Sequence, residues 1–190
     1  MTVFRLIIPA LWLVLIAYWA ISAVFAKRNV QTTAWWKLIA MRIGVVALVI
    51  YAVHDPHVRL VLRNAQNWQA SSMSLGAVGT ALVALGVGLA IHARVHLGRN
   101  WGMPMSRKED PELVTDGPYA LVRHPIYGGI ILAMLGTAIA ESLLWILPLI
   151  VFSAYFIYSA HHEEKLMRRQ FPGRYSAYMK RTRMLLPLLF

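Results

Sequence analysis

The sequence predicts an all-α integral membrane protein with five transmembrane helices and a cytosolic C-terminal helix, and two observations lead to that prediction. Of the 190 residues, 58% are hydrophobic and only 14% are charged, and the mean hydropathy is +0.55. Several apolar runs approach the roughly 20 residues that a helix needs to cross a bilayer. Cysteine is absent, which excludes disulfides, thiolate metal sites and cysteine nucleophiles.

The apolar runs place the five helices at residues 4–26, 38–53, 73–93, 126–140 and 143–160. The first run is longer than the apolar core of about 7–15 residues in signal peptides, so we expect a helix that is retained. Only Glu141 and Ser142 separate the last two runs. This short link predicts a tight antiparallel hairpin.

Small residues recur at every fourth position in two of the predicted helices. The third helix carries Gly76, Thr80, Ala84 and Gly88, and the fourth carries Gly129, Ala133 and Thr137. Such rows let helices approach closely in lipid, where no hydrophobic force drives them together. We expect both rows to be helix-contact faces.

The distribution of basic residues predicts that the N-terminus lies outside the cell and the C-terminus inside. The chain has 19 Lys and Arg against 8 Asp and Glu. With the N-terminus outside, 15 of the basic residues fall in inside segments, three fall outside, and Arg42 lies within the second span. Since basic residues favour the cytoplasmic side, we expect an inner or plasma membrane protein whose polar loop and C-terminal tail face the cytosol. Most of these basic residues flank apolar runs, so we expect them to contact anionic lipid headgroups rather than nucleic acid.

The polar residues gather in two segments that the hairpin brings to the same end. The first is the loop of residues 97–125, which ends in GPYALVRHP, and the second is HHEEKLMRRQFPGRYSAYMKR at residues 161–181. Pro125 is suited to the first turn of the fourth helix, whose free amides can hold an anion such as a carboxylate. Arg123 can add a two-pronged clamp for the same group.

The second half of this arrangement can hold a positive charge. Tyr119 and Tyr127 offer ring faces to a cation, and Glu163 and Glu164 offer negative charge. Together the two segments predict a site for a small ligand that carries both a carboxylate and a positive charge. The alternative is a set of interface residues, with the tyrosines in an aromatic belt and the glutamates paired to basic residues on a solvated helix.

The motif order ELVTDGPYALVRHPIYGG, then EE, FPGRYSAYMKR and LLP, resembles the isoprenylcysteine carboxyl methyltransferase family. These membrane enzymes are related in this half to phospholipid N-methyltransferases, and the resemblance covers about residues 94–190. It implies S-adenosylmethionine as methyl donor and a lipophilic acceptor that enters from the bilayer. The composition and apolar runs predict one membrane domain with three spans in residues 1–93, and the resemblance implies that residues 94–190 bind the cofactor.

The resemblance assigns residues to the site by position. Those implied to contact the donor are Leu113, Val114, Tyr119, His124, Pro125, Ile126, Tyr127 and Glu163. Arg123, Glu163 and Glu164 are the catalytic candidates, with His161 as a further possible base. Members that methylate prenylated cysteine carry an arginine where this chain has Ser159. Three acceptors therefore stay open: a prenylcysteine carboxylate, a phospholipid amine and a small thiol. For the carboxylate, the missing positive charge would have to come from Arg123, Arg42 or Arg94.

Two other classes of protein fit the sequence less well. A sterol-reductase-like enzyme would share the C-terminal hairpin but use NADPH, and we expect such a chain to be larger. A small carrier would need ionisable residues within its spans and often repeated halves. His92 and His96 share a helical face, but the sequence offers no third ligand, so no metal site is predicted.

Overall fold

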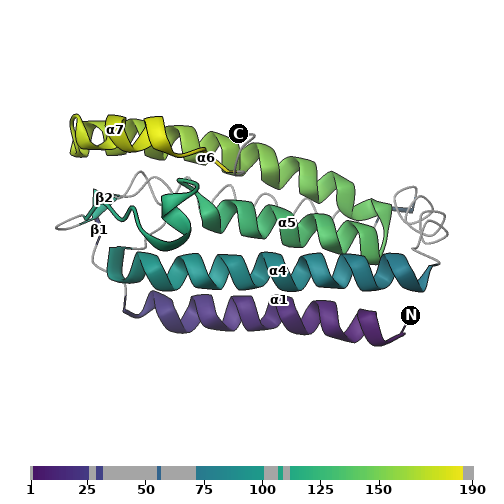
Figure 1. Cartoon of the computed structure of the whole chain (residues 1–190). Coiled ribbons are helices and arrows are strands. Elements are labelled where there is room, and N and C mark those ends of the chain that lie inside the picture. The colour runs from purple at the N-terminus through teal and green to yellow at the C-terminus, as the bar shows by residue number, and fades with distance from the viewer. Residues whose placement is uncertain are drawn as a thin grey trace.

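Four long helices lie side by side in the computed structural model, which describes residues 2–25, 29–31, 55–56, 72–100, 107–108 and 112–185. Figure 1 shows them in the order α1 (Thr2–Ala23), α4 (Met73–Leu97), α5 (Pro125–Ala140) and α6 (Ile146–Gln170). A short helix, α7 (Arg174–Arg181), folds back beside the end of α6. The first, third and fourth predicted spans therefore form helices. The second span, with Arg42, lies outside the described residues.

Short elements complete the part of the chain that the structure describes. Three single turns of 3₁₀ helix are η2 (Gly98–Asn100), η3 (Gly117–Ala120) and η4 (Leu143–Trp145). A small antiparallel pair joins β1 (Asn29–Gln31), which follows α1, to β2 (Arg107–Lys108) in the loop after α4. The other elements among the described residues are helices.

Helices α1 and α4 are each long and apolar enough to cross a membrane, and α5 is apolar but shorter. Large side chains such as Leu6, Leu13, Leu85 and Leu147 are exposed on the outer faces. An outer surface of this kind is expected where lipid rather than water surrounds a helix.

The last long helix differs from its prediction at both ends. The sequence predicts a span at residues 143–160 and a cytosolic helix in the segment after it, but α6 begins at Ile146 after the η4 turn and continues without a break to Gln170. The apolar pattern ends at Ala160, yet nothing there interrupts the backbone hydrogen bonds of the helix. The helix ends only where Pro172 and Gly173 follow, and Gly173 has a φ of 74°, which glycine adopts without strain.

Helices α4 and α5 approach each other at backbone contact. A Cβ added to Gly79 would lie 2.5 Å from the carbonyl oxygen of Gly136, and one added to Gly136 would lie 2.5 Å from that of Gly79. In the same way, a Cβ added to Gly129 would lie 2.6 Å from the carbonyl oxygen of Gly86. The row predicted on α5 is buried along its length and is confirmed as a contact face.

The contact face predicted for α4 is wrong. Ala84 and Gly88 are exposed, and nothing lies within 4 Å of a Cβ at Gly88. A row at every fourth position drifts around a helix of 3.6 residues per turn, so the buried face must alternate steps of three and four. That face consists of Gly76, Gly79, Val83, Gly86 and Ala90.

A polar contact within the apolar layer ties helix α1 to this pair. The Trp12 indole Nε1 donates to the Thr137 hydroxyl at 3.1 Å, and that hydroxyl donates to the Ala133 carbonyl at 2.9 Å. Ile8 and Leu15 of α1 are buried against the same core. The helices thus form a fixed frame for the start of α5.

Candidate active site

The segment before α5 is shaped by a glycine turn and two prolines. Gly117 has a φ of 53°, and a Cβ at this position would collide with the His96 ring. Pro118 and Tyr119 then lie buried in η3, and Pro125 occupies the first turn of α5. These constraints place the next helix, and the residues on its first turn, against the polar half of α6.

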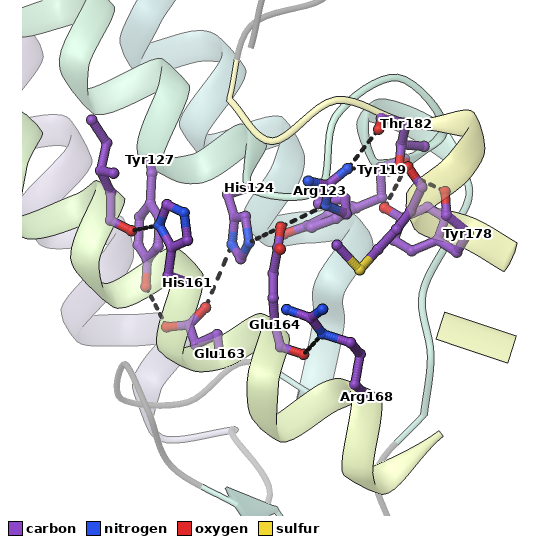
Figure 2. A network of polar contacts seen from close by, with 12 residues as sticks. Tyr119, Arg123, His124, Tyr127, His161, Glu163, Glu164, Arg168, Tyr178 and Thr182 are labelled. Carbon is purple, nitrogen blue, oxygen red and sulfur yellow. Dashed lines mark hydrogen bonds and ion pairs between the residues drawn. The ribbon is translucent and has the colours of Figure 1, made fainter. Parts of the chain in front are cut away.

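Glu163 of α6 meets two residues at the start of α5, as Figure 2 shows. The Tyr127 hydroxyl donates to Glu163 Oε1 at 2.5 Å, and His124 Nδ1 lies 3.5 Å from Glu163 Oε2. The His124 and Tyr127 rings are stacked with centroids 5.5 Å apart. The Glu163 side chain is 25% exposed, so a ligand can reach it.

Glu164 lies deeper and is paired with Arg123. Arg123 Nε donates to Glu164 Oε1 at 2.6 Å, and the two side chains are 9% and 3% exposed. The same carboxylate oxygen lies 3.5 Å from His124 Nε2. Adjacent glutamates therefore have different surroundings: one faces an accessible aromatic surface, and the other neutralises a buried guanidinium.

The charges of this cluster reinforce each other. Burial disfavours the imidazolium form of His124, but the contacts with Glu163 and Glu164 outweigh it and raise the pKa of His124 above its ordinary value. Burial likewise disfavours the charged form of Glu164, yet His124 and Arg123 hold the pKa of that carboxyl below its ordinary value. The two carboxylates therefore favour the imidazolium form of His124.

Aromatic and apolar side chains form the wall beside these charges. Tyr127 stacks on Phe156 of α6 with centroids 4.8 Å apart. Val114, Tyr119, Ile126 and Tyr127 belong to one apolar cluster. Burial raises the pKa of Tyr119, so its phenol is neutral. Among the predicted donor contacts, the half-buried Leu113 lies next to this cluster in sequence, and Pro125 is buried beside it.

The C-terminal segment closes over the other side of the η3 turn. The Tyr178 hydroxyl donates to the Tyr119 carbonyl oxygen at 2.6 Å, and burial raises the pKa of Tyr178 to about 12. Arg123 Nη1 donates to the carbonyl oxygens of Thr182 at 2.5 Å and Met179 at 3.5 Å. These contacts hold α7 against the loop that carries Tyr119.

Backbone hydrogen bonds add a parallel bridge between the same two segments. Arg183 N donates to Leu121 O at 3.2 Å, Arg123 N donates to Arg183 O at 2.8 Å, and His124 N donates to Met184 O at 3.0 Å. Neither this bridge nor the stacking of Phe156 was predicted from the sequence. The only sequence signal for the bridge is the spacing of Tyr175 and Tyr178 on a short amphipathic helix, which predicts burial but not the partner.

Several residues considered from the sequence take other places. Arg94 is buried at the end of α4 and donates to the carbonyls of Gly98 and Ser22 at 2.6 and 2.8 Å. His161 is exposed and bonds a carbonyl of its own helix. Ser159 is fully buried, and its Oγ finds no hydrogen-bond partner among the described residues.

The chain is similar to known methyltransferases. The sequence model described as phospholipid methyltransferase matches residues 75–174. Protein-S-isoprenylcysteine O-methyltransferase B of Arabidopsis thaliana is 26% identical over 148 residues, which cover 76% of this chain and 70% of that protein. The cobalt-zinc-cadmium resistance protein CzcN of Cupriavidus metallidurans is 32% identical over 108 residues, which cover 55% of this chain and 47% of that protein.

A solved structure has a similar fold. It is that of the eukaryotic intramembrane Ras methyltransferase, isoprenylcysteine carboxyl methyltransferase, with a TM-score of 0.55 and 23% sequence identity. The match covers 84% of this chain and 55% of that protein. This chain thus spans about half the length of that structure, and the likeness concerns the fold.

Proposed function

The chain belongs to the phospholipid methyltransferase family, whose members are membrane methyltransferases like the isoprenylcysteine enzymes it resembles, and on this premise we propose that it uses S-adenosylmethionine to methylate a lipophilic acceptor. The observation that carries the proposal is the joining of Tyr127, His124 and Glu163 into one cluster, in which the Glu163 side chain is 25% exposed. These residues come from two segments of the chain, yet the hydroxyl of Tyr127 lies 2.5 Å from Glu163.

The residues of the cluster fit the charges of the proposed donor. S-adenosylmethionine supplies a methyl group on a positively charged sulfur and carries an amino-acid carboxylate. Glu163 and the faces of Tyr119 and Tyr127 suit the positive charge. The first-turn amides of Ile126 and Tyr127 have no acceptor within α5 and suit the carboxylate. His124 Nε2 is buried and faces Glu164 Oε1 at 3.5 Å, so the ring is held between the two glutamates.

The proposed role of the protein is mainly to position the reactants and exclude water. Methyl transfer from sulfur is an in-line displacement, in which fixed geometry and a dry site lower the barrier. The apolar cluster of Val114, Tyr119 and Ile126 supplies the dry side. A carboxylate acceptor needs no base because it is ionised at pH 7. For an amine or thiol acceptor, Glu163 is the proposed base, since Glu164 already neutralises Arg123.

The length of α5 supports entry of the acceptor from the bilayer. Its 16 residues span about 24 Å at 1.5 Å per residue, less than the roughly 30 Å of a hydrocarbon core. If Ala140 lies at one boundary of the hydrocarbon core, Pro125 does not reach the other boundary and lies inside the core. We propose five spans with the N-terminus outside, which puts this cluster at the cytosolic boundary, within reach of both a soluble donor and a lipid. Residues 1–93 then serve as the anchor, and residues 94–190 carry the donor site.

The first test is calorimetric titration of the detergent-solubilised full chain with S-adenosylmethionine, and separately with NADPH. We expect saturable binding of the methyl donor alone. His124→Ala should weaken it at least about tenfold, because a buried hydrogen-bonding group is lost. Glu141→Gln, at the opposite end of α5, is the control and should bind as the wild type does. Binding of NADPH alone, or of neither ligand, would refute the proposal.

The second test identifies the acceptor. Methyl transfer should be assayed with a farnesylated cysteine and with phosphatidylethanolamine as separate substrates. The buried Ser159 supplies no positive charge for a carboxylate, and Arg94 is bonded to carbonyl oxygens. Transfer to neither lipid, with donor binding intact, would direct the search to small thiols.

A further inference from the structure

Two nitrogens of the Arg123 side chain, Nε and Nη1, are bonded to protein groups. Nε donates to Glu164 at 2.6 Å, and Nη1 donates to Thr182 O at 2.5 Å and to Met179 O at 3.5 Å. The side chain is only 9% exposed. A ligand carboxylate that took the guanidinium would leave Glu164 buried without its cation, which is strongly unfavourable.

The same residue also holds the C-terminal segment, residues 174–185, through its backbone. Arg123 N bonds Arg183 O, and the following residue, His124, bonds Met184 O. The carbonyls of Met179 and Thr182 lie at the end of α7, where the helix leaves acceptors unpaired and favours a positive charge. At eight residues, α7 is too short to be stable alone, so it depends on these contacts and on its buried tyrosines.

One oxygen atom of Glu164 links Arg123 to the proposed donor site. Glu164 Oε1 lies 2.6 Å from Arg123 Nε and 3.5 Å from His124 Nε2. If Arg123 is removed, Glu164 loses its fixed place, and the His124 ring loses one of the two carboxylates that flank it. The His124 ring is then no longer held in its orientation toward Glu163 by a contact with Glu164.

We propose that Arg123 is a positioning residue, which ties the C-terminal segment to Glu164 and so holds His124 and Glu163 in the geometry that binds the donor. It touches neither donor nor acceptor. The sequence alone placed Arg123 among the catalytic candidates, as a clamp for a carboxylate. This inference rests on the proposed function, because the site it serves is the proposed donor site.

The test combines donor affinity with hydrogen exchange in the full chain. In Arg123→Gln we expect amide exchange to rise within residues 174–185 while α4 and α5 keep their protection. The dissociation constant of S-adenosylmethionine should rise about tenfold or more, the scale of a lost charge-assisted hydrogen bond. Arg168→Gln is the matched control, because this exposed arginine has only a 3.4 Å bond to a backbone carbonyl. It should change neither reading.

A double-mutant cycle with Tyr178→Phe separates positioning from direct contact. Tyr178→Phe removes only the hydrogen bond to Tyr119 O, so both variants loosen the same segment. We expect their effects on donor affinity to be clearly less than additive. A direct ligand contact by Arg123 would give additive effects and would leave exchange of residues 174–185 unchanged.

The outcomes distinguish this inference from the proposed function. No donor binding by the wild type would refute the function itself. Wild-type binding, with weaker binding in Arg123→Gln but normal exchange of residues 174–185, would overturn the positioning role, as would raised exchange with unchanged affinity. If Arg123→Gln does not fold, Tyr178→Phe decides: it should raise exchange in the segment and the dissociation constant about threefold or more, and no change in either overturns the inference.

Discussion

The adjacent glutamates of α6 provide a sharp prediction, because the structure gives them opposite surroundings. The Glu164 side chain is 3% exposed and bonded to Arg123, whereas Glu163 is 25% exposed and bonded to Tyr127. We expect Glu164→Gln to act on stability and Glu163→Gln to act on donor binding. Both changes keep the shape of the side chain and remove one negative charge.

The magnitudes follow from burial. Removing one partner of a buried ion pair costs about 3–5 kcal/mol, and glutamine, which still accepts a hydrogen bond from Arg123, should cost about 3 kcal/mol. In a chain of this size that corresponds to a fall of about 6–12 °C in the unfolding midpoint. Glu163→Gln should cost about 1 kcal/mol or less, because water replaces part of what is lost. Its donor affinity should fall about 10- to 100-fold, as when a hydrogen bond or contact loses its charged member.

The assay is thermal unfolding in detergent, followed by calorimetric titration with S-adenosylmethionine below the lower midpoint. Glu141→Gln serves as the control for the chemical change alone. An equal loss of stability in the two variants would refute the assignment of separate roles. So would a Glu164→Gln variant with the wild-type midpoint, since the pair with Arg123 would then contribute nothing.

Three further predictions concern packing and pH. Gly86→Val should destabilise the fold by at least about 1–3 kcal/mol, because its Cβ would lie 2.5 Å from a backbone nitrogen of α5; Gly88→Val, in open space, should leave the unfolding midpoint unchanged. The contribution of His124 to stability is fully present below its ordinary pKa of 6.5 and is lost as the pH rises through its raised pKa in the folded state. The contribution of Glu164 is fully present above its ordinary pKa of 4.5 and is lost as the pH falls through its lowered pKa in the folded state. The midpoint should therefore be highest between these limits, and His124→Gln should remove the decline on the alkaline side; a persistent decline would contradict this. Trp12→Phe should cost about 0.6 kcal/mol, the typical value of a hydrogen bond between membrane helices, and a loss several times larger in the same unfolding assay would contradict that estimate.

The helices at the centre of the fold follow from local sequence. The run that begins at Pro125 was predicted within one residue, because proline fixes the first turn and apolar residues fill the rest. The row of Gly129, Ala133 and Thr137 was predicted as a contact face for the same local reason. The face of α4 was not, since its small residues allow several rows, and only the partner helix selects one. The end of α6 was missed because loss of apolar character marks a membrane boundary and not the end of a helix.

The composition of the candidate site was readable from the sequence, since glycine, proline, tyrosine, histidine and glutamate at a predicted helix start have few purely structural uses. The donor and acceptor are proposals that rest on family likeness and on this chemistry. What the tertiary structure alone decided is how the charges are divided. Arg123 lies 41 positions from Glu164 along the chain, and its remaining partners, Met179 and Thr182, lie at the end of α7. No local pattern records such a pairing, because it depends on how two distant backbones meet, and that contact separates the accessible Glu163 from the buried Glu164.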